Sequence, residues 1–304
     1  MRELITCADQ SLVLIDELEL ALHPKAQIEL LQYLTDIAQQ KQLTIIFSTH
    51  SVSLLKRVPR QNILFLEQID GVVSVLKGCY PTYALGGIAY DEERAPDVVI
   101  YVEDEAALYV TEPLVRLCIS HRLGQQVGLF PTVHVVPIGA FINVVRFLTR
   151  GQALLPVTTA SSALLDQDVQ TESLATWQRE QNYTALAEFQ QHANRIQYLP
   201  WTPEVGLITF FQDHQADAER SIREHFQDHR LSIRQQEIGQ IPAMASGQQR
   251  RACKSAVGRV IHRLAGSLPN SSEEQVRKGL FEVFAKWYFQ RNRAAILQLI
   301  APLL

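Results

Sequence analysis

Residues 11–24 of the chain read SLVLIDELELALHP, and this stretch decides the fold of the N-terminal part. A short, mostly aliphatic run passes directly into two adjacent carboxylates, Asp16 and Glu17. Such a run predicts a strand of a parallel sheet that is covered on both faces. Because ligands bind where parallel strands end, we interpret the two acids as part of a site at the carboxyl end of this strand. A solvated acidic turn is the alternative interpretation.

Strands and helices alternate along the first part of the chain, which predicts an α/β sheet. An amphipathic helix is expected over residues 25–40, and a second buried strand over residues 43–47 that ends in FSTHS. A hairpin is expected over residues 63–76, with Asp70-Gly71 as its turn. Residues 78–97 are rich in Gly, Pro, Tyr and acids and are interpreted as a linker.

A second alternation follows the linker, so the sequence predicts a second α/β sheet. Its strands are expected at residues 98–102, 133–137, 163–165 and 195–199, and its helices at 105–120, 142–149 and 181–193. From residue 216 onward almost all of the sequence is expected to be helical, with a break at 266–272, where Gly, Pro, Asn and Ser cluster.

The composition is that of a globular protein with about two domains. Of the 304 residues, 47% are hydrophobic and 20% are charged, and the net charge is −4, so binding of nucleic acid would need a local basic patch. The four cysteines form no CxxC pair, which argues against a disulfide framework or a zinc site and favours the reducing cytoplasm. No apolar run approaches the ~18 residues of a membrane span, so no membrane partner is expected.

The segments LVLIDE, LALHP and FSTHS, in this order, resemble the Walker B strand, the D-loop and the His-switch of ABC-type ATPases. In nucleotide hydrolysis, Asp16 would hold Mg²⁺ and Glu17 would polarise the attacking water, and His50 would reach the γ-phosphate. The chain contains no G-x-x-x-x-G-K-[ST] motif and no signature motif. Residues 1–5 (MRELI) resemble the end of the signature helix. We therefore expect the chain to begin within the ATPase domain, with the other half upstream or in another chain, and to bind ATP poorly alone.

Carboxylates also end the strands of the second predicted sheet. Glu103 closes the strand in VVIYVEDE, Asp166 and Asp168 follow the strand in SSALLDQDV, and Glu204 follows RIQYLPWTP. Acids gathered from three strand ends could hold two divalent cations, Mg²⁺ or Mn²⁺, and hydrolyse a phosphodiester. Taken singly, the D-x-D pair could be an ordinary loop, and Glu204 could be an acid favoured in the first turn of a helix.

Together these residues resemble the TOPRIM domain of topoisomerases, primases and related nucleases, over about residues 97–215. The matching features are Glu103, Gly139 in VHVVPIGA, and the pair Asp166 and Asp168. In that family a glycine commonly follows the glutamate, whereas here Asp104 does. This departure leaves open which acid among residues 103–105 ligates metal, and we favour Glu103 because it is nearest the strand.

An ABC-type ATPase segment followed by a TOPRIM domain resembles the OLD (overcoming lysogenization defect) family of ATP-dependent nucleases. The resemblance predicts an α/β protein, with a partial ABC-type ATPase sheet at 1–77, a linker at 78–97, a Rossmann-like parallel TOPRIM sheet at 98–215 and a helical region at 216–304. It implies a metal-dependent DNA endonuclease with a two-metal site (Mg²⁺ or Mn²⁺), controlled by ATP bound to a complete ATPase domain. It also implies homo-oligomers formed through the ATPase domains and a role in anti-phage defence, sometimes beside a partner protein or a retron.

The resemblance further implies a lysine in the helical region that assists at the scissile phosphate. Lys278 in VRKGLFEVFAKW is our choice, and Lys254 in RRACKSA is the competitor. A basic stripe could track a DNA backbone or could be a solvated helix face; its members are Arg250, Arg251, Lys254, Arg259 and Arg263. The alternative function is an ATP-gated regulatory or scaffold protein with a degenerate, non-cleaving TOPRIM site, which the replacement of glycine by Asp104 favours. A topoisomerase or primase is a third interpretation, but no zinc motif accompanies it.

Overall fold

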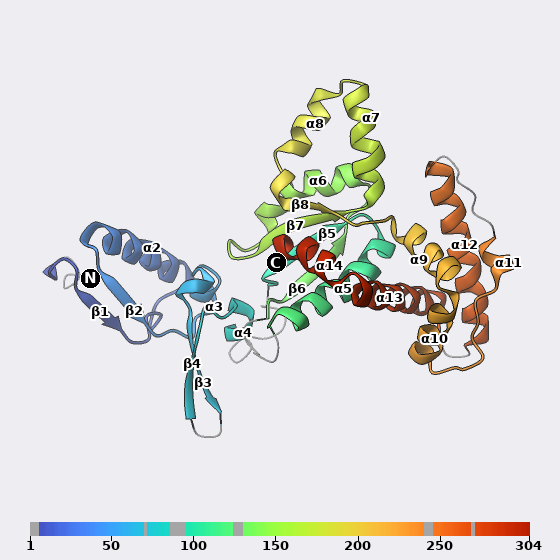
Figure 1. The fold of residues 1–304 in the computed structure, drawn as a ribbon. Coiled ribbons are helices and arrows are strands. Elements are labelled where there is room, and N and C mark those ends of the chain that lie inside the picture. Colours follow the sequence, from blue (N-terminus) through green and yellow to red (C-terminus); the bar gives the residue numbers. More distant parts are fainter. Residues whose placement is uncertain (1–5, 70–71, 86–94, 124–129, 240–245, 269–270) are drawn as a thin grey trace. The chain divides into compact units, whose positions relative to one another are not determined.

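A computed structural model describes residues 6–69, 72–85, 95–123, 130–239, 246–268 and 271–304, arranged in two compact units (Figure 1). The first unit comprises Met1–Asp97, Gln126–Thr132 and Leu155–Ala160; the second comprises Val98–Gln125, Val133–Leu154 and Ser161–Leu304. The expected sheet at 98–215 and the expected helical region therefore lie in one unit. Within the expected linker, Pro81–Leu85 form the short helix α4, and residues 86–94 lie outside the described part of the chain.

The first unit is built on two parallel strands. Strand β1 (Leu12–Ile15) pairs with β2 (Thr44–Phe47), and helix α2 (Pro24–Lys41) connects them, as the sequence predicts. Pro24 is suited to the first turn of α2, because its missing N–H would have no partner there. Leu18, Leu34 and Leu54 form the centre of a small core between this sheet, α2 and helix α3 (Val52–Leu55).

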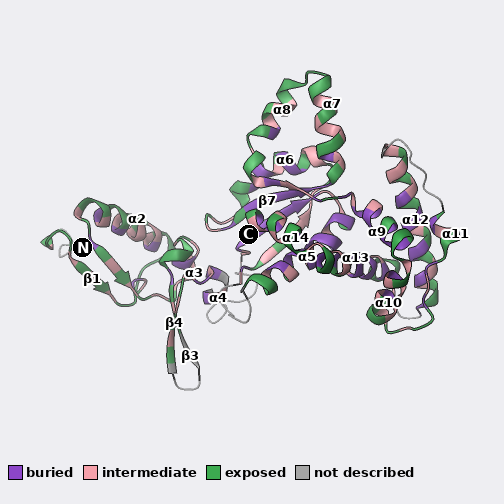
Figure 2. Cartoon of the chain, viewed as in Figure 1, coloured by how far each residue is buried: buried purple, intermediate pink, exposed green. Residues whose placement is uncertain are grey.

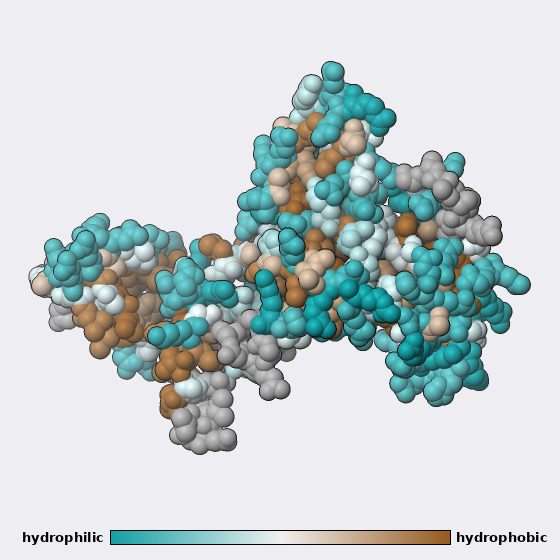
Figure 3. All heavy atoms as spheres, in the orientation of Figure 1, coloured by the Kyte–Doolittle hydropathy of each residue, from teal (hydrophilic) through white to brown (hydrophobic). Residues whose placement is uncertain are grey.

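One face of the β1–β2 sheet is exposed, so the prediction that these strands are covered on both faces is wrong. Leu12 and Leu14 are 61% and 70% exposed, and the neighbouring Ile46 is 47% exposed. Alternate side chains of a strand point to opposite faces, and α2 is packed against only one of them. Figure 2 shows exposed residues along β1, and Figure 3 shows hydrophobic atoms gathered at the surface of this part of the chain.

The predicted hairpin is confirmed. Strand β3 (Leu64–Ile69) pairs antiparallel with β4 (Val72–Lys77), with Leu66 opposite Val75, and both of these side chains are exposed. The expected turn at Asp70-Gly71 lies outside the described residues.

The second unit contains a four-stranded sheet in the order β6-β5-β7-β8 (Figure 1). The strands are β5 (Val98–Val102), β6 (Val133–Pro137), β7 (Ala160–Leu165) and β8 (Ile196–Tyr198). The pairs β5–β6 and β7–β8 are parallel. All residues of β5 and all but the first residue of β7 are buried, which is typical of the central strands of a parallel sheet.

Helices cover both faces of this sheet (Figure 1). Helix α5 (Glu105–Leu123) lies on one face, and α6 (Phe141–Arg150) lies on the other with α7 (Leu174–Arg179) and α8 (Tyr183–Gln190). The sequence predicted one helix over 181–193. It did not predict α7 or the π-helix η4 (Val169–Ser173) that precedes it, because no apolar periodicity marks these residues.

The C-terminal part is helical, but the helices begin earlier than expected, at Pro203. They are α9 (Pro203–Asp213), α10 (Gln215–Phe226), α11 (Gln235–Ile238), α12 (Ser246–Ser267), α13 (Glu273–Arg291) and α14 (Arg293–Ile300). The predicted break falls between α12 and α13, where Ser272 and Gln275 form a capping box. Phe210, Phe281 and Phe284 are fully buried, and they join these helices to the sheet in one core. No helix among the described residues is long and apolar enough to span a bilayer.

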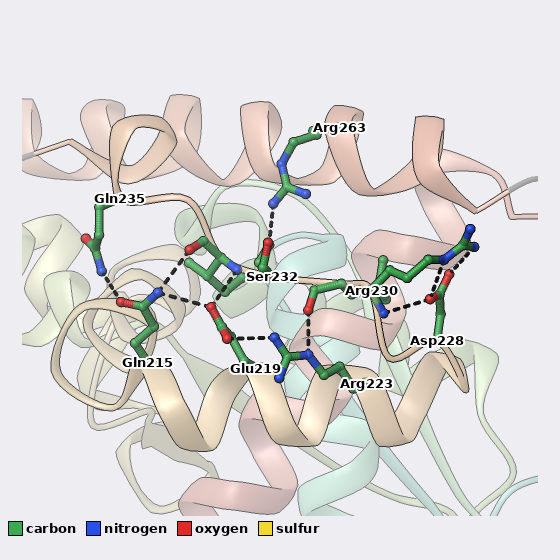
Figure 4. A network of polar contacts seen from close by, with 10 residues as sticks. Gln215, Glu219, Arg223, Asp228, Arg230, Ser232, Gln235 and Arg263 are labelled. Carbon is green, nitrogen blue, oxygen red and sulfur yellow. Dashed lines mark hydrogen bonds and ion pairs between the residues drawn. The ribbon is translucent and has the colours of Figure 1, made fainter.

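A polar network fixes α12 to α10 (Figure 4). Glu219 of α10 accepts hydrogen bonds from the Ile233 N–H and from Arg223, at 3.1 and 2.9 Å. From α12, Arg263 donates to the Ser232 carbonyl at 2.6 Å and pairs with Glu237 at 2.5 Å. The network therefore sets the position of α12, the helix that carries Arg250 and Lys254.

Candidate active site

The ends of β5 and β7 are joined through the side chain of Glu103. The Asp166 N–H donates a hydrogen bond to Glu103 Oε1 at 3.0 Å, and the Phe141 N–H also donates to this carboxylate. Gly139 donates its N–H to the Glu103 carbonyl at 2.8 Å and has a φ of +117°. Only glycine adopts this conformation readily, so the predicted role of Gly139 in a tight strand-to-helix turn is confirmed.

Asp104 caps helix α5. Its Oδ1 accepts hydrogen bonds from the N–H groups of Ala106 and Ala107, at 3.0 and 3.1 Å. An aspartate in this position satisfies N–H groups that have no partner within the helix. The residue that replaces the expected glycine thus begins the helix, and Glu105 is exposed in its first turn.

Asp166 is buried, as is Glu204 in the same cluster. Asp166 is 7% exposed, and its Oδ1 is buried without a hydrogen-bond partner in the described structure. Both oxygens of Asp168 are engaged: Oδ1 accepts from the Thr202 hydroxyl at 3.0 Å, and Oδ2 lies 3.1 Å from Nη1 of Arg250. The two predicted aspartates therefore have different surroundings.

Glu204 joins the same cluster from the first turn of α9. Its side chain is buried, and its Oε1 lies 3.9 Å from Nζ of Lys254, which is also 3.9 Å from Oδ2 of Asp104. Since these are ion-pair distances without hydrogen bonds, Lys254 can move toward a bound anion at small cost. The alternative that Glu204 lies in the first turn of a helix is confirmed, and the residue also lies close to the other acids.

Burial and mutual repulsion shift the titration of these acids. Burial raises the pKa of Glu103 from its ordinary value near 4.5 to about 7, and Asp168 and Asp104 add to the rise. Burial also raises the pKa of Asp166 well above its ordinary value, with further increases from Glu103, Asp104, Asp168 and Glu204. Burial and Asp104 raise the pKa of Glu204, while Lys254 and Arg277 oppose the increase. The cluster therefore has an excess of negative charge that a cation would relieve.

The two candidate lysines lie in different places. Lys254 on α12 faces Glu204 and Asp104, whereas Lys278 on α13 lies 3.8 Å from Oε2 of Glu112 and 6.0 Å from the centre of the Tyr109 ring. The structure thus brings Lys254 to the acids and places Lys278, our choice from the sequence, against α5.

The expected basic stripe is not continuous. Arg259 donates to the Glu237 carbonyl at 3.0 Å, and Arg263 pairs with the Glu237 carboxylate, so both contact α11. Arg250 faces the acids and Arg251 is exposed. The five residues therefore do not form one continuous stripe, because the helix directs them to different partners, and contact with DNA stays a prediction.

Sequence reasoning missed two residues of this region, one that contacts Asp168 directly and one that contacts its partner Arg250. Thr202 holds Asp168, and Glu172 lies 2.8 Å from Nη1 of Arg250 through its Oε1. Glu172 follows Asp168 by one helical turn, a spacing that indicates a shared face. This signal was available, but it depended on recognising η4 as helical.

The fit of a divalent cation can be judged from the donor set. Hard oxygen ligands and the buried, unpartnered Oδ1 of Asp166 suit Mg²⁺ or Mn²⁺. Within the described ranges, no three His, Cys, Asp or Glu side chains stand in positions to ligate one ion together. Mg²⁺ is commonly held by one or two carboxylates and several waters, so the residues fit a partly hydrated cation.

A second set of polar residues lies at the ends of β1 and β2. Ser48 donates to Asp16 Oδ1 at 2.5 Å and accepts from the Glu17 N–H at 2.7 Å. The His50 N–H donates to Oε1 of Glu19 at 2.6 Å, a contact that the sequence did not predict. Asp16, Glu17 and His50 are exposed, and Glu17 has a φ of +47°, which is strained for a residue other than glycine.

Comparison with known proteins concerns the N-terminal part. Residues 4–56 match the family model described as "AAA domain, putative AbiEii toxin, Type IV TA system". No curated protein matches the chain. The matched residues include β1, α2, β2 and the acids Asp16 and Glu17. The N-terminal part is thus similar to an AAA-type domain, consistent with an ABC-like ATPase, and this likeness suggests that it binds ATP.

Proposed function

We propose that the chain is an OLD-type DNA endonuclease, in which the second unit is a TOPRIM domain and an ABC-like ATPase controls it. The proposed reaction is hydrolysis of a phosphodiester: water attacks phosphorus, and the bond to one ester oxygen breaks, which leaves a phosphate and a hydroxyl end. Mg²⁺ or Mn²⁺ would activate the water and stabilise the leaving oxygen.

The positions of the residues in the acid cluster indicate a different role for each in this reaction. Glu103, Asp166, Asp168 and Glu204 would hold the cations, and the hydrogen bonds to Glu103 keep its carboxylate at the strand end. Lys254, rather than Lys278, is the lysine within reach of the acids, and its charge would offset the developing charge on the phosphate.

One observation carries the proposal: the acids that follow β5 and β7 and the acid at the start of α9 lie close together, and Oδ1 of the buried Asp166 has no hydrogen-bond partner among the described residues. Buried carboxylates that repel one another cost stability unless they serve a ligand or are protonated. Bound divalent cations would offset the repulsion between these carboxylates.

Nicking of supercoiled plasmid with Mn²⁺ tests the proposal on the full chain. Asp166→Asn, which keeps the shape of the side chain, is expected to abolish cleavage, and Asp213→Asn, an exposed position on α9, is the matched control. Undiminished nicking by Asp166→Asn, with thermal unfolding like that of the unsubstituted protein, would refute it.

A regulatory or scaffold protein with a non-cleaving site is the second candidate. The pairing of Asp168 with Arg250 and the absence, within the described residues, of three positioned ligands favour it. A titration with Mn²⁺ separates the two candidates, because a degenerate site gains no stability from the cation.

The proposed partners and setting follow the resemblance. DNA is the proposed substrate, the ATPase part would form homo-oligomers, and the proposed setting is anti-phage defence, with or without a partner protein or retron. The negative net charge leaves DNA contact to local groups such as Arg251 and Lys254, both exposed on α12.

A further inference from the structure

We propose that Asp168 and Glu172 form the second cation position of the acid cluster, and that Arg250 occupies this position when no cation is bound. The inference rests on the proposed nuclease function and adds Glu172 as a ligand and Arg250 as the competing charge.

A single atom bridges the two carboxylates. Nη1 of Arg250 lies 3.1 Å from Oδ2 of Asp168 and 2.8 Å from Oε1 of Glu172. This nitrogen is buried, and it makes no hydrogen bond of acceptable angle within the described residues. The guanidinium therefore interacts with the two carboxylates by electrostatic attraction and not through a directed hydrogen bond. A metal ion between the same two oxygens would interact in the same way.

The backbone places both carboxylates on one side. Asp168 precedes the π-helix η4, and Glu172 lies within it, one turn later. Such π-helical turns are rare and occur frequently at functional sites. The other oxygen of Asp168 accepts from Thr202, which fixes the carboxylate while leaving Oδ2 to face Arg250.

The remaining acids explain why a second cation is needed. Asp166, two residues before Asp168, has a buried Oδ1 without a hydrogen-bond partner in the described part of the chain, and it lies near Glu103 and Glu204. Among the described residues, Arg250 pairs with Asp168 and Glu172, while Lys254 faces Glu204 and Asp104. Two carboxylates and bound waters are a sufficient set for Mg²⁺ or Mn²⁺.

Calorimetric titration of the full chain with Mn²⁺ alone tests the inference. Arg250→Gln removes the competing charge, so the affinity of one Mn²⁺ site should rise about tenfold or more. Glu172→Gln removes a ligand, so the affinity of the same site should fall about tenfold or more. The matched controls are Arg251→Gln, the exposed neighbour on α12, and Glu180→Gln, an exposed acid after α7, and both should leave the affinity unchanged.

The outcomes separate this inference from the proposed function. Unchanged or weakened Mn²⁺ binding in Arg250→Gln, or unchanged binding in Glu172→Gln, overturns the inference even if Asp166→Asn abolishes cleavage. Absence of Mn²⁺ binding by the unsubstituted chain overturns both. If Arg250→Gln does not fold, Glu172→Gln decides the question. This variant should fold, because it removes one negative charge from a cluster that already has an excess of negative charge.

Discussion

The N–H of Asp166 donates a 3.0 Å hydrogen bond to Oε1 of Glu103, and this bond ties the ends of two neighbouring strands to one buried carboxylate. Because the bond stabilises the ionised form of Glu103, it partly opposes the effect of burial on the pKa. The two residues are separated by 63 positions in the sequence, so only the sheet brings them together.

The cation-free protein should become less stable as the pH rises. The pKa of Glu103, raised to about 7 by burial, means that the folded state binds more protons than the unfolded chain between about pH 4.5 and 7. The stability that protonation of Glu103 confers is fully present below about pH 4.5 and is lost as the pH rises to about 7. The free energy of unfolding should fall by up to about 3 kcal/mol over this range. Urea unfolding in the presence of EDTA at pH 5.5 and 8 measures it.

The matched control for this pH dependence is Glu103→Gln, which should reduce the slope and leave a residual dependence from the raised pKa values of Asp166 and Glu204. Saturating Mn²⁺ should flatten the curve, because a bound cation favours the ionised acids. A stability that rises between pH 5.5 and 8 in EDTA would contradict the prediction.

Lys254→Met should reduce plasmid cleavage by a factor of about 10² to 10³, because a cation at the reacting phosphate is removed. Lys278→Met should change the rate by less than about threefold, since its Nζ lies beside Glu112 rather than among the acids. Initial nicking rates with Mn²⁺ check both. The reverse order of effects would restore Lys278 as the assisting lysine.

Arg263→Met should destabilise the fold by about 2–3 kcal/mol, because the Ser232 carbonyl and the Glu237 carboxylate lose a half-buried, charged partner. Arg259→Met, on the same helix and also bonded to Glu237, is the control and should cost less than about 1 kcal/mol because its side chain is exposed. Denaturant midpoints compare the variants, and equal losses would show that the Arg263 contacts contribute little.

The chain alone should bind ATP with a dissociation constant above about 100 µM. Its sequence contains no P-loop lysine or glycine-rich phosphate loop, and Asp16, Glu17 and His50 are exposed in the first unit. Titration with a fluorescent ATP analogue and Mg²⁺ measures the affinity. Tight binding that is unaffected by Asp16→Asn would mean that another part of the chain holds the nucleotide.

Much of the second sheet could be predicted from the sequence, because its strands are short aliphatic runs, and acids directly follow β5 and β7. The predicted bounds of β5 and β6 agree with the structure at both ends. The convergence of Glu103, Asp166 and Glu204 also followed from the rule that parallel strands end at one edge.

Other features could not be predicted, since they depend on tertiary contacts. The exposure of Leu12 and Leu14 depends on which helices are packed against β1, and the sequence pattern alone gave no such information. The choice between Lys254 and Lys278 depended on which side of α12 and of α13 faces the acids. Both lysines lie on long helices, so the sequence did not distinguish them. Arg250 was recognised as basic, but its partners Asp168 and Glu172 were not foreseen.

Asp104 gives the cluster an adjustable charge. Aspartate and glycine are both acceptable where a helix begins, and exchanging them changes helix stability by only a few tenths of a kcal/mol. Asp104→Gly would therefore leave α5 in place while it removes one negative charge beside Lys254. One substitution that the backbone tolerates can therefore change the net charge of the acid cluster. At this position the charge of the site can change without a large change in the stability of the fold.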